Sequence, residues 1–379
     1  MGVFMKEVAI DLLWLRPKKV GGTEFYIRNL LDGLRELEED FRFVLITALD
    51  NADTFDHYLT DQRFRMIRVN IRSEEIGKRL IWQNLCENRF LRKNGLRTCF
   101  SPVFFRPFLN GGVSWMNTIH DIQAYHYPKY HPFYEVAYSR LCWYANCFFS
   151  KKVIVISEYV KQDLIKHFHF KPDRVEVIYN PVAVEEPDPA VFEKVRGKYR
   201  VERGEYYYTI SQMIPHKNLM TLVSVMEKIK KEKRPLPHRL LISGVSGFRS
   251  EQLKELIRKK ALEDVICLTG FVENDVKFSL LKNCRAFLFP SVFEGFGMPP
   301  IEAMMLEAPV ITTKCTCIPE VTQNQANYVE DPFCVDDWIA QMEKDPPGET
   351  GLDASVYEKG RISRKYLESI RDFAGRENL

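Results

Sequence analysis

The sequence predicts an α/β protein built from two doubly wound domains. Apolar runs of strand length alternate with amphipathic segments of helix length along almost the whole chain, a pattern typical of βα units around parallel sheets. At about 100–200 residues per domain, 379 residues suffice for two domains. The alternation stops at residues 183–205, where proline and charged residues concentrate as they do at a domain boundary. We therefore expect two similar α/β halves that face each other across a cleft.

Each predicted element rests on its own periodicity. Continuous apolar runs predict buried strands in the first half at residues 7–15, 41–49, 64–69, 114–119 and 151–157. Apolar residues at spacings of three and four predict helices there at residues 23–37, 76–93 and 157–168. The same two tests predict strands in the second half at 206–211, 239–244, 265–270, 285–291 and 309–313. They predict its helices at 217–231, 250–263, 274–283 and 301–308. We place the first domain at 1–183, the second at 184–355, and at 356–379 a last helix that packs back toward the first domain.

Composition excludes several classes of protein. The chain has 54 Lys and Arg against 51 Asp and Glu, a balance unlike that of a dedicated nucleic-acid binder. The sequence contains no run of about 18 apolar residues and no secretory signal pattern. Nine cysteines without zinc-ligand spacing indicate reduced thiols rather than a disulfide framework. We expect a cytoplasmic protein that does not bind nucleic acid.

The most informative stretch is residues 287–313, where a buried strand ends at Pro290 and a helix begins near Pro299. Glu294 lies in the intervening glycine-bearing loop, and Glu302 follows eight positions later. Glycines let the backbone approach a ligand, and the amides at a helix start favour an anion. Ionised carboxylates accept hydrogen bonds from vicinal hydroxyls. The stretch suits a sugar or ribose with an attached phosphate, although a capped helix with two solvated glutamates fits the spacing too.

Three further candidates follow predicted strands, where ligands bind in open α/β sheets. Lys217 opens a helix and places a cation near its amides, or is simply an exposed lysine at a helix start. His120 comes directly after a strand and before Asp121, a position where a histidine is often structural. Gly21 and Gly22 precede a helix that we expect Thr23 to cap; they either approach a ligand or form a tight turn.

Missing motifs narrow the enzyme classes. The first strand is not followed by G-x-G-x-x-G, and no G-x-x-x-x-G-K-[ST] occurs, which removes the main support for dinucleotide and P-loop sites. The chain also lacks G-x-S-x-G and a D-x-D pair of the kind with which some enzymes hold a metal ion. Any charge stabilisation is therefore expected from the protein itself, without metal.

The segment EGFGMPPIEA, residues 294–303, resembles the E-x7-E signature of the family 4 retaining glycosyltransferases, which have the two-domain GT-B fold. Other segments resemble the family in the same order, so chance similarity is improbable. They are the glycine-rich loop and helix at 20–34, the His-Asp segment at 118–128, the end of the first domain at 153–182, the phosphate-binding loop at 206–222, and the strand and turn at 308–321.

The resemblance implies a role for each matching residue. Glu302 would hold the ribose hydroxyls of a nucleotide-sugar donor, Glu294 the hydroxyls of the donor sugar, and Lys217 the departing diphosphate. His120 would lie beside the donor sugar at the reacting face. The remaining residues of the predicted donor site are Gly21, Gly22, Gln212, His216, Arg249, Gly270, Phe271, Gly295, Phe296, Gly297 and Met298.

One position departs from the family pattern. The family usually has Gly-Arg where this chain has Ser211-Gln212. Glutamine carries no charge, so phosphate affinity is expected to be lower unless His216 or Arg249 compensates. The departure keeps open a non-catalytic subunit that binds a nucleotide sugar.

The resemblance implies transfer of a hexosyl group from a nucleotide-diphosphate sugar (UDP-, GDP- or dTDP-linked) to an acceptor hydroxyl, with retained anomeric configuration and no cofactor. The first domain would bind the acceptor and the second the donor. Alternatives on the same architecture are a nucleotide-sugar epimerase and a glycosidic phosphorylase.

Two surface-forming segments suggest the acceptor. Residues 125–149 contain ten aromatic residues, which suit sugar stacking, a membrane interface or ordinary helix packing. Seven basic residues between 72 and 97 outnumber three acidic ones around an amphipathic helix, which either lies on an anionic membrane or is a solvated face. We hypothesise a saccharide or lipid-linked saccharide acceptor and peripheral attachment at the inner face of the cytoplasmic membrane.

Overall fold

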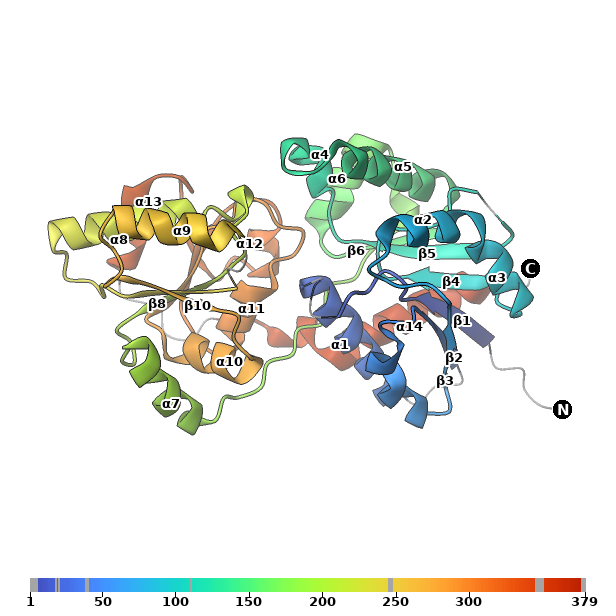
Figure 1. Ribbon diagram of the computed structural model, residues 1–379, viewed down its shortest axis with the longest axis horizontal. Helices are drawn as coiled ribbons and strands as arrows, with labels where there is room; N and C mark the ends of the chain where they lie inside the picture. The colour runs from blue at the N-terminus through green and yellow to red at the C-terminus, as the bar shows by residue number, and fades with distance from the viewer. Residues whose placement is uncertain are drawn as a thin grey trace. The chain divides into compact units, whose positions relative to one another are not determined.

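The computed structural model describes residues 6–17, 19, 21–37, 41–109, 111–244, 248–344 and 351–375 (Figure 1). The chain forms two compact units, one made of the residues up to Pro181 together with those from Ser355 onward, the other of Val182–Ala354. Each unit is a parallel sheet with helices on both faces, so the predicted fold class, two Rossmann-like α/β domains, is confirmed. None of the helices in the described residues combines the length and hydropathy needed to cross a bilayer.

In the described residues, the sheet of the first unit has seven strands in the order β3-β2-β1-β4-β5-β6-β7. The strands are β1 Lys6–Asp11, β2 Phe41–Thr47, β3 Phe64–Arg68, β4 Thr98–Ser101, β5 Ser114–Ile119, β6 Lys152–Val155 and β7 Val175–Val177. All described pairs are parallel. The order reverses between β1 and β4.

Helices cover both faces of this sheet (Figure 1). They are α1 Gly22–Glu36, α2 Ile76–Leu85, α3 Glu87–Lys93, α4 Gln123–His126, α5 Phe133–Phe149, α6 Glu158–Phe168 and α14 Lys359–Gly375, with shorter 3-10 turns at Ala52–Thr60, Pro128–Tyr130 and Pro172–Arg174. The C-terminal helix α14 packs against α1, where the hydroxyl of Tyr26 donates a hydrogen bond to that of Tyr366 at 2.9 Å. Gly33 allows this approach, since a Cβ there would lie 2.0 Å from the Ser363 hydroxyl.

The second unit has a six-stranded parallel sheet, again in the described residues, with the order β10-β9-β8-β11-β12-β13. Its strands are β8 Tyr207–Ile210, β9 Leu240–Ser243, β10 Ile266–Gly270, β11 Ala286–Phe289, β12 Val310–Thr313 and β13 Asn327–Val329. Its helices are α7 Pro189–Tyr199, α8 Leu219–Glu232, α9 Phe248–Lys259, α10 Asn274–Asn283, α11 Met298–Met305, α12 Ile318–Val321 and α13 Val335–Met342. Separate apolar cores lie on the two faces, one under α8, α9 and α13, the other under α7, α10 and α11.

Several predicted elements have different bounds in the structure. The predicted strand at 7–15 ends at Asp11, and the predicted helix at 76–93 is two helices separated at Cys86. The boundary segment 183–205 contains α7, whose Phe192 and Tyr199 are buried in the second core. Because α7 has a buried face, this stretch belongs to the second unit and is not only a linker.

Candidate functional site

The order of the second sheet reverses between β8 and β11. The chain continues from β8 to β9 and β10 on one side, and from β11 to β12 and β13 on the other. In open α/β sheets, ligands bind outside the carboxyl ends of the strands at such a switch point. The loops that follow β8 and β11 are therefore where the fold favours a binding site.

An ion pair joins these two loops. Lys217 ends the short 3-10 turn Pro215–Lys217 after β8, and Glu294 lies in the loop after β11. The Nζ of Lys217 lies 2.6 Å from Oε1 of Glu294. The two side chains are 22% and 12% exposed, so both are largely withdrawn from solvent yet reachable. Two residues predicted to act on one donor molecule thus meet.

Backbone contacts hold both loops in register. The carbonyl oxygen of His216 accepts hydrogen bonds from the amide of Val292 at 2.8 Å and from the hydroxyl of Ser291 at 3.3 Å. These bonds tie the residue before Lys217 to the segment that leads to Glu294. The lysine and the glutamate are therefore positioned by the backbone, and not only by their own ion pair.

The loop after β12 supports Glu294 from another side. The Glu294 amide donates to Oγ1 of Thr316 at 3.1 Å, and the Cys317 thiol lies 3.2 Å from the carbonyl oxygen of Glu294. Burial, and next the negative charge of Glu294, raise the pKa of the Cys317 thiol well above its ordinary value. The thiol therefore keeps its proton and acts as a hydrogen-bond donor.

A second ion pair fixes Glu302. Its Oε1 lies 2.8 Å from Nζ of Lys277 on α10, and the two side chains are 9% and 15% exposed. Sequence reasoning missed Lys277. A usable signal was present, because Lys277 is a basic residue in the first turn of a helix that follows a strand, as Lys217 nearly is.

The start of α11 limits which amides can bind an anion. Gly297 precedes the helix in the left-handed conformation with φ of +81°, which strains any residue with a Cβ. Pro299 and Pro300 follow Met298 and carry no amide hydrogen. Backbone donors on this loop must therefore come from residues 295–298, the segment predicted to contact sugar and diphosphate.

Other predicted residues of the second unit have varied surroundings. Gln212 and Phe271 are exposed, and Gly270 ends β10 with φ of +72°. The His216 side chain is only 3% exposed and packs edge-on against Phe293, so its predicted contact with a phosphate stays a prediction. Arg249 lies in α9, but its side chain is outside what the structure describes, so its predicted contact with a phosphate stays a prediction.

The first unit holds the remaining predicted residues. The His120 imidazole lies with Nε2 2.9 Å from the carbonyl oxygen of Pro102 and packs edge-on against Tyr26. Burial lowers the pKa of His120 to about 4, so the ring is neutral at neutral pH. Since a carbonyl can only accept, Nε2 carries the proton and Nδ1 bears the lone pair.

The glycine loop of the first unit differs from the prediction at its helix cap. Gly21, with φ of +61°, occupies the cap position of α1, and Gly22 is the first helical residue. The expectation that Thr23 caps this helix is wrong, because the helix begins at Gly22 and Thr23 is its second residue. Both glycines are exposed, and no atom lies within 4 Å of where their Cβ atoms would be.

A hollow of about 700 Å³ in the first unit lies away from these residues. It is formed around the starts of β6 and β7, at the amino ends of the strands, where α/β sheets rarely bind substrates. Four basic side chains there face four acidic ones: Lys151, Lys152, Lys161, Arg174, Glu158, Asp173, Glu176 and Asp372. Its charge is balanced, so it shows no preference for an anionic donor.

Residues 72–97 and 125–149 are the two segments that the sequence analysis linked to the acceptor, and some of their side chains are buried. Of the seven basic residues between 72 and 97, Arg79 is buried, and its guanidinium donates to the carbonyl oxygens of Leu13 and Ser73 at 3.4 Å. The idea of a fully solvated basic strip is therefore wrong at this residue. Within the aromatic segment Trp143 is buried, whereas Phe133, Tyr134 and Phe148 of α5 are 86%, 70% and 68% exposed.

Two models of known protein families match the chain. The model described as "Glycosyltransferase Family 4" matches residues 20–186, and the model described as "Glycosyl transferases group 1" matches residues 191–345. The chain belongs to the family 4 glycosyltransferases. The predicted resemblance is confirmed, and the second match contains both ion-paired glutamates.

Two relatives of this family 4 member are named as O-antigen chain mannosyltransferases. The O-antigen chain mannosyltransferase B of Escherichia coli is 30% identical over 240 residues, 62% of this chain and 61% of that protein. The O-antigen chain mannosyltransferase RfbU of Salmonella typhimurium is 28% identical over 213 residues, 56% of this chain and 55% of that protein. The matches thus span little more than half the length of these relatives.

Solved structures confirm the GT-B fold. Anabaena HepE in complex with UDP and glucose has a TM-score of 0.70 at 14% identity, covering 97% of this chain and 100% of that one. WaaG, a glycosyltransferase involved in lipopolysaccharide biosynthesis, has a TM-score of 0.67 at 15% identity, with 95% of each chain covered. At such identities the likeness establishes the fold alone.

Proposed function

We propose that the chain is a retaining glycosyltransferase that moves a hexosyl group from a nucleotide-diphosphate sugar to an acceptor hydroxyl, in polysaccharide or glycolipid biosynthesis. The observation that carries the proposal is the pair of glutamates eight residues apart, each ion-paired with a lysine, at the carboxyl edge of the second sheet. Two carboxylates for hydroxyls and a cation for phosphate are the groups that a nucleotide sugar requires.

The Lys217–Glu294 pair is suited to exchange partners when the donor binds. A diphosphate brings negative charge that competes with Glu294 for the Lys217 ammonium. Glu294, released from the ion pair, can then accept hydrogen bonds from sugar hydroxyls. In the transition state Lys217 and the amides of residues 295–298 would stabilise the departing diphosphate, and such preorganised charge is a main source of catalysis.

The Lys277–Glu302 pair is suited to the ribose. Glu302 is 9% exposed, and the Lys277 ammonium compensates its charge at 2.8 Å. Its second oxygen can accept from a ribose hydroxyl, because a carboxylate offers about four lone-pair sites. The pair therefore holds a ready acceptor at a nearly buried position.

His120 is suited to the reacting face of the sugar. Breaking the bond to the diphosphate leaves oxocarbenium character on the sugar, which a nearby positive charge would oppose. A neutral imidazole whose pKa burial lowers to about 4 avoids this repulsion. We assign transfer to a metal-independent mechanism with attack on the same face of the sugar, as the family resemblance implies.

The sugar transferred is proposed to be mannose, because both curated relatives compared above are named mannosyltransferases. We propose UDP, GDP or dTDP as the nucleotide of the donor. UDP is the nucleotide in the HepE complex, which also contains glucose. These names belong to other proteins and guide the choice of substrates to test.

The acceptor is proposed to be a lipid-linked saccharide at the cytoplasmic membrane face. Tyr134, Leu141 and Phe148 of α5 recur every seven residues, on one face of the helix, and are 70%, 57% and 68% exposed. Exposed aromatic and aliphatic side chains on a helix favour the membrane interface. Flotation with anionic vesicles at low salt tests this part, and a protein that stays at the bottom of the gradient excludes it.

A thermal-shift screen of UDP, GDP, ADP and dTDP with their common sugars tests the donor, since a ligand that binds the folded chain stabilises it by RT ln(1 + [L]/Kd). Product analysis with the preferred donor, in EDTA, then tests the reaction. Transfer with the anomeric configuration retained supports the proposal. Conversion without acceptor identifies an epimerase, dependence on inorganic phosphate a phosphorylase, and binding without turnover a non-catalytic subunit.

A further inference from the structure

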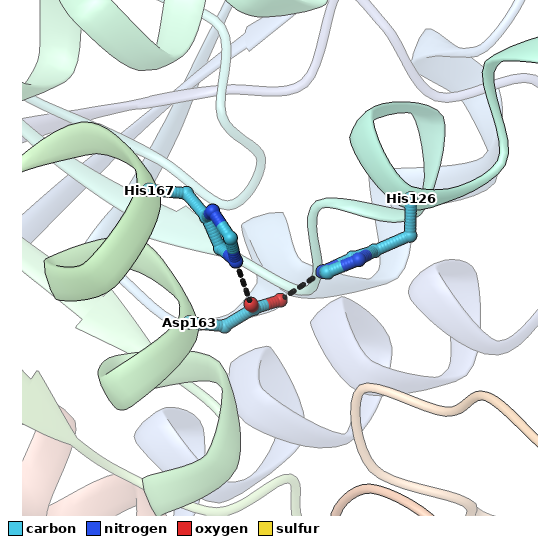
Figure 2. Close-up of side chains that lie close together, drawn as sticks. All are labelled: His126, Asp163 and His167. Carbon is cyan, nitrogen blue, oxygen red and sulfur yellow. Dashed lines mark hydrogen bonds and ion pairs between the residues drawn. The ribbon is translucent and has the colours of Figure 1, made fainter.

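A cluster of two histidines and one aspartate joins two helices of the first unit (Figure 2). His126 ends the short helix α4, while Asp163 and His167 lie four residues apart on α6 and therefore share one face of it. The Nε2 of His126 is 2.7 Å from one Asp163 oxygen, and the Nε2 of His167 is 3.4 Å from the other. The cluster contains none of the residues assigned to the donor.

The three side chains present metal-ligating atoms to a common point. Within the described part of the chain, they are the one group of three such residues whose ligand atoms all lie within 4.8 Å of one another. The Asp163 side chain is 7% exposed, and those of His126 and His167 are 27% and 21% exposed. The site is thus enclosed at its carboxylate and open to solvent beside its imidazoles.

The chemistry of these donors favours one class of ion. Two imidazole nitrogens and a carboxylate oxygen suit zinc and neighbouring transition metals, whereas magnesium and calcium prefer oxygen ligands. Zinc bonds of about 2.0–2.1 Å in a tetrahedral site require ligand atoms about 3.3 Å apart. The two histidines contact different Asp163 oxygens, His167 at 3.4 Å and His126 at 2.7 Å. All the ligand atoms lie within 4.8 Å of one another, so a zinc ion held by one of these oxygens requires small shifts of the imidazoles toward it.

The rings around the cluster restrict how the histidines can turn. The two imidazole planes cross at 86° with centroids 5.5 Å apart. Tyr125 packs against His167 at 4.7 Å, and the Arg140 guanidinium lies 5.2 Å from the Tyr125 ring. Aromatic packing on one side therefore holds the imidazoles near the carboxylate.

We propose that His126, Asp163 and His167 bind one zinc ion, with a water molecule completing the tetrahedron, as a clasp between α4 and α6. The helix α4 begins three residues after His120, so the clasp fixes the far end of the loop that starts at the predicted reacting face. The ion has a structural and positioning role, because the cluster contains none of the residues assigned to the donor. The proposal does not rest on the assigned glycosyl transfer.

Calorimetric titration of the chelator-stripped full-length chain with zinc tests the site. We expect one saturable site in the wild type and at least tenfold weaker binding in His126→Ala and in His167→Ala. His131→Ala is the matched control. His131 is in the same unit and also lies near a carboxylate, with its Nδ1 3.8 Å from Glu135, but it is not part of the cluster. The control should bind zinc as the wild type does.

Two further readouts make the result decisive. Cobalt in place of zinc should give the intense visible absorption of a tetrahedral site in the wild type and lose it in Asp163→Asn, which keeps the side-chain shape. Circular dichroism checks that each variant is folded. Zinc binding of equal strength in both histidine variants would place the ion elsewhere, for example on free thiols, and overturn the proposal. A wild type that shows no saturable zinc binding would overturn it as well.

Discussion

Lys217 and Glu294 form a 2.6 Å ion pair between the ends of β8 and β11, the adjacent strands at which the second sheet reverses its order. The pair places a cation and a carboxylate where the fold directs a ligand. Both side chains are held by loops that hydrogen-bond to each other through the carbonyl oxygen of His216. Each partner neutralises the other until a ligand of opposite charge competes for one of them.

Removing either member of this pair should abolish most transfer. We expect Lys217→Ala and Glu294→Ala each to lower kcat/KM by about 10²–10³-fold or more, because each removes a preorganised charge from the transition state. Steady-state assays with the preferred donor measure the loss.

The control for this prediction is Lys228→Ala. Lys228 pairs with Asp336 at 2.5 Å on the surface of α8, and a solvent-exposed pair of this kind contributes little to stability. This variant should keep normal turnover. Near-normal turnover of folded Lys217→Ala or Glu294→Ala would refute the assigned site.

Replacing Lys277 should affect donor binding more than the chemical step. In Lys277→Ala, Glu302 loses its compensating charge at a nearly buried position and becomes a poorer acceptor for the ribose hydroxyls. We expect the KM for the donor to rise about tenfold with kcat changed little. Lys282→Ala is the control, because Lys282 lies on the same helix and pairs with exposed Glu186. Equal effects on KM in both variants would contradict the role of Lys277.

Site residues could be predicted from the sequence where they stand in a local sequence pattern, and less well where only a long-range contact brings them together. Glu294 and Glu302 stand in a local glycine and proline pattern, so their spacing was visible. The position of Lys277 in the first turn of a helix after a strand was a usable signal. Its partner Glu302 could not be predicted, because α10 packing beside α11 makes a long-range contact that leaves no local pattern. The strand β4, with the sequence TCFS, was missed because three of its four residues are small or polar, although all four are buried.

The buried charges of the first unit were hidden for a similar reason. Arg79 lies on a helix whose sequence looks amphipathic and basic, yet it is 8% exposed. Its guanidinium donates to the carbonyl oxygens of Ser73, in the loop just before the helix, and of Leu13, which is far away in the sequence. Likewise, α7 falls in a segment whose prolines and charges resemble a linker. Its buried face becomes visible only in the structure, where it packs into the core of the second unit that also lies under α10 and α11.

Restoring the arginine of the family pattern should strengthen phosphate binding. Gln212 is exposed after β8, in the same loop as Lys217, so a guanidinium there can reach an incoming phosphate without being buried. We expect Gln212→Arg to tighten nucleotide-diphosphate binding by about tenfold, the equivalent of about 1.4 kcal/mol for one charge-assisted contact. Titration calorimetry measures the change, and Gln212→Glu should weaken binding. Unchanged affinity in both variants would show that this position does not face the phosphates.

Because of Glu87, the free energy of unfolding of the chain should decrease as the pH rises. The residue is fully buried, and neither of its carboxyl oxygens has a hydrogen-bond partner within the described residues. Burial, and next the negative charge of Asp11, raise the pKa of Glu87 well above its ordinary value. Burial also raises the pKa of Asp11, to about 6. The folded chain therefore keeps a proton on Glu87 that the unfolded chain releases above about pH 4.3.

The sign of the pH dependence follows from this difference in bound protons. Above about pH 4.3 the unfolded state binds fewer protons than the folded state, so the free energy of unfolding decreases as pH rises, up to the raised pKa of Glu87. Glu87→Met removes the titrating group at similar volume. We expect it to raise the melting temperature slightly at pH 5 and by several degrees at pH 8, measured by calorimetry. Glu368→Gln, an exposed change on α14, should shift neither value. An equal gain at both pH values for Glu87→Met would show that Glu87 is ionised in the folded chain, stabilised by Arg79.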